Sequence, residues 1–300
     1  MSNSIPELSF EAIEKGDSIS ISILKAALEE HGFFSITNHG VSEELLTKCY
    51  SLAKDFFHLP RDVKDKYHEK SLKGARGYTP LGIETAVGET IPDQKEFWHH
   101  GPNVNDSFDS RIPKNISVSQ IADFNNQFDL LFHQLNLLGL KVLSSIALIL
   151  GKEPSFFDSW ACKGNSVLRL IHYPPVQDKS NILRARAHED INLITLLVGA
   201  EESGLEVQNR DGDWVPIEAK SKSIVCNIGD MMQLVTRSQL KSTTHRVIDN
   251  KAGSSSSRYS MPFFLHPSPE VELCSIVDNS TESISAHDFL EARLKAIKLY

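Results

Sequence analysis

The second half of the chain contains a close succession of short runs that predict β-strands, and this feature constrains the fold more than any other. Most runs are rich in β-branched and aromatic residues. They are Val167–Tyr173, Leu193–Val198, Leu205–Gln208, Trp214–Ile217, Ser223–Ile228, His245–Ile248 and Tyr259–Leu265. Turns are indicated at Asp211-Gly212, Gly229-Asp230 and Ala252–Ser257. Because no helix of convincing length interrupts the block, a parallel α/β sheet is disfavoured and a jelly roll is favoured.

The first half of the chain has helical periodicity instead. Apolar residues recur at three- and four-residue spacing in Ser20–His31 and Ser42–Phe57, and again from Ser117 to about Leu150. The run Gly32–Gly40 is aromatic and β-branched and is closed by glycine, so it predicts one strand between the first two helices. The long third helix is expected to pack against the sheet that follows it.

The fold class predicted from these patterns is α+β. A double-stranded β-helix (jelly-roll) core is expected to be flanked by helices, with a mainly helical N-terminal portion. The predicted segments are residues 1–115 (N-terminal, helical with short strands), 116–160 (a supporting long helix), 161–270 (the jelly-roll core) and 271–300 (a helical tail). The tail looks amphipathic and is expected to cover either its own core or that of a neighbour, so the oligomeric state stays open.

Two features precede the block of strands. The stretch Arg76–Gly88 is glycine-rich and carries Tyr78 and Glu84. We expect an ordinary surface loop there, with a lid over a substrate site as the alternative. His99 and His100 are adjacent, so on a strand they would point to opposite sides, and at most one of them would face a cavity.

Composition narrows the possible partners and location. The 300 residues are 40% hydrophobic and 23% charged, with a formal net charge of −8. This is typical of a globular protein, and the negative average field disfavours nucleic acid or a membrane surface as a partner. Met1–Glu7 has no apolar signal core, and the most apolar stretch, Leu137–Leu150, is too short to span a bilayer. Four separated cysteines without a C-x-x-C pair are expected to be reduced thiols. We therefore expect a cytoplasmic protein.

Common nucleotide, nicotinamide, zincin and serine-hydrolase motifs are missing from the sequence. What remains is His188-Glu189-Asp190, followed at a distance by His245. On an extended backbone, His188 and Asp190 would turn toward one point, and a histidine from a later strand would complete one face of an octahedron. Two imidazoles and one carboxylate are the facial triad of non-haem Fe(II) oxygenases, which leaves three positions for a bidentate co-substrate and dioxygen.

A second pair of polar residues lies on the last predicted strand. Arg258 and Ser260 share one face of it. A guanidinium holds a carboxylate through two charge-assisted hydrogen bonds, and a hydroxyl adds a third. The distal carboxylate of 2-oxoglutarate needs such a partner once its 2-oxo acid end is bound to iron. The alternative is an arginine in a surface ion pair.

The chain resembles the isopenicillin N synthase-like group of 2-oxoglutarate/Fe(II) dioxygenases, and the resemblance covers almost its full length. The pieces that carry it occur in the family's order: Gly32–Val41, Asp93–Phe97, Ala187–Asp190 with Ile194–Leu197, Gly204–Val207, Trp214–Pro216, Asn227–Asp230, Thr244–Val247 and Arg258-x-Ser260. Any one piece is modest, but the ordered set is highly specific.

The resemblance implies a role for each matching residue. His188, Asp190 and His245 become the iron ligands, and Arg258 with Ser260 becomes the clamp on 2-oxoglutarate. Tyr173 matches the tyrosine of the family's N-x-Y-P motif, which reaches toward the co-substrate. The family's asparagine is Ile171 here, a departure that removes one polar contact. Arg169, in strand phase with both, is the candidate substitute, with an ion pair at the barrel edge as its alternative.

The activity implied is an oxygenase that uses Fe(II), 2-oxoglutarate and dioxygen on a small molecule and releases succinate and CO2. With Asp190 in the third ligand position, hydroxylation, desaturation or cyclisation is favoured over halogenation. Two alternatives stay open: an oxidase like isopenicillin N synthase, which takes all its electrons from substrate, and an inactive jelly-roll binding protein. A zinc hydrolase is a more remote alternative. The sequence does not identify the primary substrate.

Overall fold

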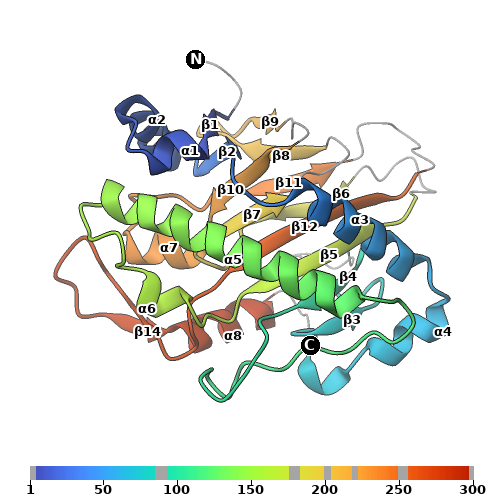
Figure 1. Ribbon diagram of the computed structural model, residues 1–300. Helices are drawn as coiled ribbons and strands as arrows, with labels where there is room; N and C mark the ends of the chain where they lie inside the picture. The colour runs from blue at the N-terminus through green and yellow to red at the C-terminus, as the bar shows by residue number, and fades with distance from the viewer. Residues whose placement is uncertain are drawn as a thin grey trace.

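Two β-sheets form the centre of the molecule, and helices cover one side of the larger one (Figure 1). The computed structural model describes residues 5–84, 93–175, 183–198, 204–217, 222–248 and 256–296. The strands are β1 (Glu7–Ser9), β2 (Phe33–Thr37), β3 (Gly77–Thr79), β4 (Glu96–His100), β5 (Val167–Tyr173), β6 (Leu183–His188), β7 (Ile194–Val198), β8 (Leu205–Gln208), β9 (Trp214–Pro216), β10 (Ile224–Ile228), β11 (His245–Ile248), β12 (Arg258–Leu265), β13 (Glu272–Cys274) and β14 (Ser283–Ser285). The helices are α1 (Phe10–Glu14), α2 (Ser18–Glu30), α3 (Glu43–His58), α4 (Arg61–Lys64), α5 (Phe124–Ile149), α6 (Asp158–Ala161), α7 (Asp230–Val235) and α8 (Ala286–Ala296).

The larger sheet has the strand order β1-β2-β10-β7-β12-β5-β4-β3, and the smaller has the order β6-β11-β8-β9. Only β1 and β2 pair in parallel; the other strand pairs are antiparallel among the residues described. Residues from both sheets meet in one buried cluster, which includes Phe97, Ile171, Ala185 and Val247. The two sheets therefore pack face to face, as expected for a jelly roll. Strands from both halves of the chain share the larger sheet.

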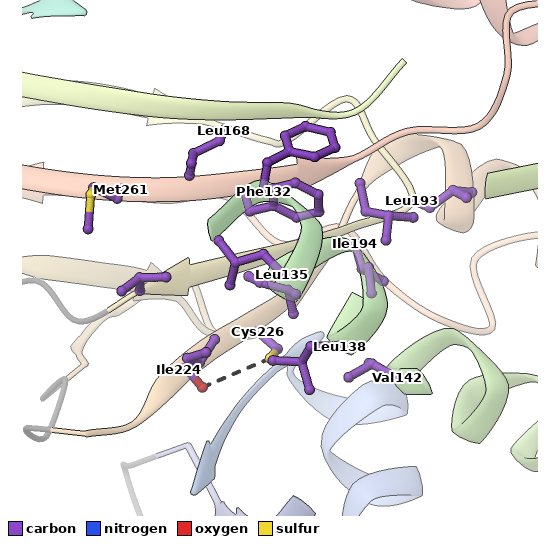
Figure 2. Packing of buried hydrophobic residues seen from close by; sticks show 14 of the residues in the cluster. Phe132, Leu135, Leu138, Val142, Leu168, Leu193, Ile194, Ile224, Cys226 and Met261 are labelled. Atoms are coloured by element: carbon purple, nitrogen blue, oxygen red, sulfur yellow. Dashed lines mark hydrogen bonds between the residues drawn. The ribbon is translucent and has the colours of Figure 1, made fainter. Parts of the chain in front are cut away.

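Each strand of the larger sheet shows the two-residue alternation that separates its faces. In β5, Leu168 and Leu170 belong to the main hydrophobic core, whereas Ile171 and Tyr173 belong to the cluster between the sheets. Figure 2 shows part of the outer-face core, with Leu168, Met261 and Cys226 from the sheet and Leu135 and Leu138 from α5. The sheet thus has an outer face under α5 and an inner face toward the smaller sheet.

Helix α5 covers the outer face of the larger sheet, as the sequence predicts. By length and composition α5 alone among the described helices would suffice to cross a membrane, but its side chains from Phe128 to Ala147 contribute to the protein's own core. The helix begins at Phe124 rather than near Ser117. The reason is Asn125, whose side chain accepts from the Val118 amide at 2.8 Å and donates to the Ile116 carbonyl at 2.9 Å, holding the preceding segment in an irregular path.

Two expectations about the second half need correction. The Gly229-Asp230 turn is the start of helix α7, in which the Asp230 amide donates to the Asp190 carbonyl at 2.7 Å. Strand β6 is not among the predicted runs, because its sequence Leu-Arg-Ala-Arg-Ala-His lacks the β-branched and aromatic residues that mark the others. The other predicted strands and the helices α2 and α3 agree with the structure to within a few residues.

The stretch Arg76–Gly88 is only partly the surface loop that the sequence predicts: Leu81 and Ile83 are exposed, whereas Arg76–Thr79 is buried. Arg76 is 1% exposed, and every residue of β3, the edge strand that follows it directly, is buried. Residues 85–88 lie outside the described residues. All four cysteines are free thiols in the structure, and Cys49 and Cys226 are buried.

Candidate active site

His188, Asp190 and His245 come together at one end of the two sheets and are called the triad from here on. One potential ligand atom from each residue lies within 4.8 Å of those of the other two. His188 and His245 are direct partners in the pairing of β6 with β11, and their ring centroids are 4.4 Å apart. His245 Nε2 lies 3.8 Å from Asp190 Oδ1. The triad predicted from the sequence is therefore preassembled.

A β-bulge in β6 turns His188 toward its partners. Val247 pairs with Ala185, but His245, two residues earlier in β11, pairs with His188, three residues later in β6. The additional residue lets both Ala185 and His188 face the interior, a use that bulges commonly have beside active sites. The simple i, i+2 alternation expected for His188 and Asp190 is wrong in detail, because β6 ends at His188 and Asp190 lies beyond the strand.

Both imidazoles are held in the tautomer that a metal needs. His188 Nδ1 lies 2.7 Å from the Arg186 carbonyl oxygen, and His245 Nδ1 lies 3.1 Å from the Thr243 carbonyl oxygen. Because a carbonyl only accepts, each Nδ1 carries the proton and each Nε2 has a free lone pair. Such outer contacts fix the orientation of metal-binding histidines.

Hydrogen bonds to one of its two oxygens orient the carboxylate of Asp190. Its Oδ2 accepts from Thr195 Oγ1 at 2.6 Å and from Asn227 Nδ2 at 2.8 Å, which leaves Oδ1 facing His245. The loop after Asp190 packs closely on Gly229, where any Cβ would collide with the backbone oxygen of Asn192. A glycine at this position therefore lets the loop bring Asp190 to the two histidines.

The protonation states of the triad suit a cation. Burial lowers the pKa of His188 to about 4, and the neighbouring His245 adds to the effect. Burial would raise the pKa of Asp190, but His245, His188 and the two hydrogen bonds to Oδ2 outweigh it and lower that pKa. At neutral pH the triad thus offers a neutral imidazole at His188 and an ionised carboxylate, the forms that bind metal. The donor set fits Fe(II) in a facial triad.

Arg258 and Ser260 lie on the inner face of β12, 2% and 4% exposed. They stand opposite Tyr173 and Ile171 of β5, and the Arg258 guanidinium carbon lies 5.3 Å from the centre of the Tyr173 ring. Arg258 Nε and Nη1 have no hydrogen-bond partner, and no carboxylate within the described residues pairs with it. A buried cation without an anion is unstable unless a ligand supplies the anion. The alternative for Arg258, a surface ion pair, is therefore absent from the described part of the chain, and the site fits a carboxylate ligand.

A cavity of about 580 Å³ opens beside the triad and is called the active-site cavity here. His188 and Asp190 line it, and so do Arg169 and His99. Arg258, Ser260 and Tyr173 are not lining residues, so they lie apart from this cavity, between the sheets.

Arg169 is fixed on the wall of the active-site cavity. Its Nε donates to His99 Nε2 at 2.6 Å, and its guanidinium carbon lies 4.4 Å from the Phe97 ring centre and 5.3 Å from that of Phe264. Its Nη1 is 3.3 Å from Glu84 Oε2. Of the two adjacent histidines, His99 faces the cavity, and His100 faces the outer side, where it contacts Asp129 at 2.8 Å.

Three polar residues of the site received no role from the sequence. Thr195 and Asn227 occur in segments that carry the family resemblance, but their contact with Asp190 becomes visible only in the folded chain. One signal was present: Asn227 is the one side chain with an amide in the otherwise apolar run Ile224–Ile228. Arg76, which lines the active-site cavity, gave no such signal.

Comparison with known proteins identifies the family. Residues 164–267 match the model of the 2OG-Fe(II) oxygenase superfamily, and residues 5–120 match that of the non-haem dioxygenase in morphine synthesis N-terminal. A 2-oxoglutarate-dependent dioxygenase of Didymella fabae is 32% identical over 271 residues, covering 83% of this chain and 80% of the relative.

Two solved structures are similar over nearly the whole fold. A protein of Caulobacter crescentus assigned to the 2OG-Fe(II) oxygenase family is 39% identical with a TM-score of 0.89, covering 99% of this chain and 100% of its own. A full-length Neurospora crassa protein in complex with alpha-KG and thymine is 26% identical with a TM-score of 0.84, covering 97% and 96%. These matches confirm the predicted jelly-roll fold and the predicted cofactors, Fe(II), 2-oxoglutarate and dioxygen. The chain therefore belongs to the isopenicillin N synthase-like group of the 2OG-Fe(II) oxygenase superfamily and is a non-haem, 2-oxoglutarate-dependent oxygenase.

Proposed function

We propose that the triad holds the iron of this oxygenase and that Arg258 anchors the distal carboxylate of 2-oxoglutarate, so that a C–H bond of a small molecule in the active-site cavity is oxidised. The observation that carries the proposal is the pairing of two features: a preassembled donor set, and a buried guanidinium with free N–H groups. When bound, Fe(II) and 2-oxoglutarate supply the oxidising equivalents from dioxygen, with succinate and CO2 as co-products.

The protein's own residues orient the reactants and exclude water. The carbonyls of Arg186 and Thr243 fix the orientation of the two imidazoles. Thr195 and Asn227 bind Asp190 Oδ2, so that Oδ1 is directed toward the metal site. The unpartnered Nε and Nη1 of Arg258 leave N–H groups for a carboxylate, and Ser260 adds a hydroxyl on the same face of β12. Tyr173 supports the guanidinium through its ring.

We further propose that Arg169 helps to position a reactant at the wall of the active-site cavity. Its support is geometric: it lines the cavity, one nitrogen is held by His99, and two aromatic rings flank its guanidinium. A small-molecule substrate is supported by the cavity volume and by the Neurospora crassa relative, which was crystallised with thymine. Hydroxylation, desaturation and cyclisation all remain within the proposal, and a cytoplasmic location remains a prediction from the sequence.

The test is succinate formation by protein purified without oxygen and then given Fe(II), 2-oxoglutarate and air. We expect slow succinate release by the wild type, none by His188→Ala, and strongly reduced release by Arg258→Met at limiting 2-oxoglutarate. Succinate formation that survives in His188→Ala would contradict the assignment of the triad. Product formation from a metabolite mixture without any need for 2-oxoglutarate would instead point to the oxidase alternative.

A further inference from the structure

Besides Arg258, which lies outside the active-site cavity, a buried arginine on the wall of that cavity has no anionic partner among the described residues. Arg76 is 1% exposed and lines the cavity that His188 and Asp190 also line. Its Nη1 donates to the Ala75 carbonyl at 2.7 Å and its Nη2 donates to Asn165 Oδ1 at 3.0 Å, while its Nε has no partner. No Asp or Glu side chain among the described residues pairs with it. Neutral acceptors alone thus surround a fully buried cation, an arrangement that costs folding free energy.

The other buried cations on the cavity wall are paired. Lys95 Nζ lies 2.7 Å from Glu84 Oε1 and 2.9 Å from Asp93 Oδ2, and Arg169 contacts Glu84 as described. Arg111, nearer the surface, contacts Asp109 at 2.6 Å. Among the buried cations in the described part of this wall, Arg76 is therefore the one without an anionic partner.

Arg76 is held in place by a close approach to the backbone. Its guanidinium lies against Gly101, where a Cβ would collide with Nε and Nη2. Burial lowers the pKa of Arg76 to about 10, which still leaves the side chain protonated at neutral pH. The guanidinium is therefore closely packed and protonated at neutral pH.

A second polar group without a partner lies on the same cavity wall. His266 is 8% exposed, lines the cavity, and its Nδ1 makes no hydrogen bond. Burial lowers the pKa of His266 to about 4, with Asp190 opposing and Arg76 adding to the shift. Its imidazole is therefore neutral at pH 7 with one N–H to donate, and it lies within electrostatic reach of both the triad and Arg76.

We propose that Arg76, together with Asn165 and His266, forms a subsite that binds a carboxylate of the primary substrate. This inference rests on the proposed function and deepens it, because it gives the substrate a chemical class: a small molecule with one carboxylate and an apolar body. One unpaired positive charge matches a monoanion. The apolar body would contact Val167, Phe264 and Leu290 on the same wall. The subsite is separate from Arg258, which does not line the cavity.

The experiment measures binding to protein loaded with Mn(II) and saturating 2-oxoglutarate under argon, so that no turnover occurs and the Arg258 site is filled. The probes are carboxylates of increasing size and their carboxamides: acetate and acetamide, 4-methylpentanoate and 4-methylpentanamide, phenylacetate and phenylacetamide. Calorimetry and thermal unfolding are recorded for the wild type and Arg76→Met, and Arg111→Met serves as a control on a paired arginine of the same cavity.

We expect the wild type to bind at least one carboxylate about 10- to 100-fold more tightly than its carboxamide, the loss typical for a hydrogen bond to a charged group. Arg76→Met should remove that preference, Arg76→Lys should restore part of it, and Arg111→Met should leave it unchanged. Without probe, Arg76→Met should unfold at or above the wild-type temperature, since it removes an unpaired buried charge.

The proposal is overturned if the wild type prefers no carboxylate over its carboxamide, or if the preference persists in Arg76→Met. It is also overturned if Arg76→Met and Arg76→Lys only destabilise the fold without changing the preference. Failure of the proposed function has a different signature, because the protein would then fail to bind 2-oxoglutarate before any probe is added. The probe series can still be run on that protein and judged by the same criteria.

Discussion

A buried charge network on the outer face of the larger sheet and the buried Arg258 on its inner face differ in how their charges are compensated. On the outer face, Glu96 accepts from Lys64 Nζ at 2.8 and 2.9 Å and contacts His172 Nδ1 at 2.7 Å, with the Tyr78 hydroxyl as a further donor. Every charged group in this network has an oppositely charged or hydrogen-bonding partner. On the inner face, Arg258 is equally buried but has two N–H groups without a partner.

We infer that the compensated charges around Glu96 stabilise the fold, whereas the uncompensated charge of Arg258 serves to bind a ligand. In a network whose charges are all paired, the interactions offset the cost of burying them, so removing one partner lowers the stability of the fold. A buried cation without a partner is compensated only by a bound anionic ligand, so removing it weakens ligand binding and leaves the stability of the fold intact. The free energy of unfolding and the ligand affinity of each variant can be measured separately, so the two roles can be told apart at each position.

The largest effect is expected at the triad itself. Asp190→Ala removes its one carboxylate, and metal affinity should fall by more than the roughly 10- to 100-fold that loss of an outer partner costs. Binding of Mn(II) measured by electron paramagnetic resonance checks this. Glu189→Ala is the matched control, because the neighbouring carboxylate accepts from Thr244 Oγ1 at 2.9 Å and is not a member of the triad. Equal losses in the two variants would contradict the assignment.

The outer network should respond in stability. Glu96→Gln leaves Lys64 buried without a counter-ion, and the free energy of unfolding should drop by about 3–5 kcal/mol, as for other broken buried pairs. Urea unfolding of the metal-free protein measures the loss. Affinity for 2-oxoglutarate in the protein that remains folded should be unchanged. If Glu96→Gln spares stability but weakens 2-oxoglutarate binding, the proposed difference between the Glu96 network and Arg258 is wrong.

The support of Asp190 is expected to have an intermediate effect. Asn227→Leu removes the amide that donates to Asp190 Oδ2 at 2.8 Å, so the carboxylate loses part of its orientation. Metal affinity should fall about 10- to 100-fold. The same titration with Mn(II) gives the value, and Thr195→Val should act in the same direction. A variant with normal metal affinity would show that the outer contact does not position the ligand.

The smallest effect is the dependence of stability on pH. Burial would raise the pKa of Glu96, but hydrogen bonds from His172, Lys64 and Tyr78 outweigh it and lower that pKa below its ordinary value of 4.5. A carboxyl with a lowered folded-state pKa stabilises the fold fully above 4.5 and loses that contribution as the pH falls through the folded-state value. Unfolding free energies on either side of pH 4.5 should therefore decline less steeply in Glu96→Gln than in the wild type. If the unfolding free energy falls with pH equally steeply in both proteins, Glu96 does not contribute to the decline.

Much of the fold and the centre of the site could be predicted from residue patterns. The alternation in β5 placed Arg169 and Tyr173 on one face, and the structure has them there. The ordered motifs predict that His188, Asp190 and His245 form one metal site. These signals are local, or they are repeated along the chain in a fixed order.

The remainder depends on contacts that no local pattern encodes. Strand β6 has two arginines in six residues, and its register follows from a bulge against β11. Arg76 lies in a glycine-rich segment that resembles a loop, and its burial results from the packing of Gly101 against it. Whether a buried cation has a partner is a property of the assembled interior, so the unpaired state of Arg76 and Arg258 could not be read from the sequence.

The difference between the Glu96 network and the unpaired inner-face cation is tested most directly at Arg258. Titration of 2-oxoglutarate into Mn(II)-loaded protein under argon, with urea unfolding of the same samples, compares the wild type with Arg258→Met. Loss of two charge-assisted hydrogen bonds predicts affinity weaker by roughly 10²- to 10⁴-fold, with stability of the ligand-free protein equal to or above that of the wild type. Unchanged affinity for 2-oxoglutarate, or a loss of stability as large as that of Glu96→Gln, would contradict the assignment of Arg258 as the site of the co-substrate carboxylate.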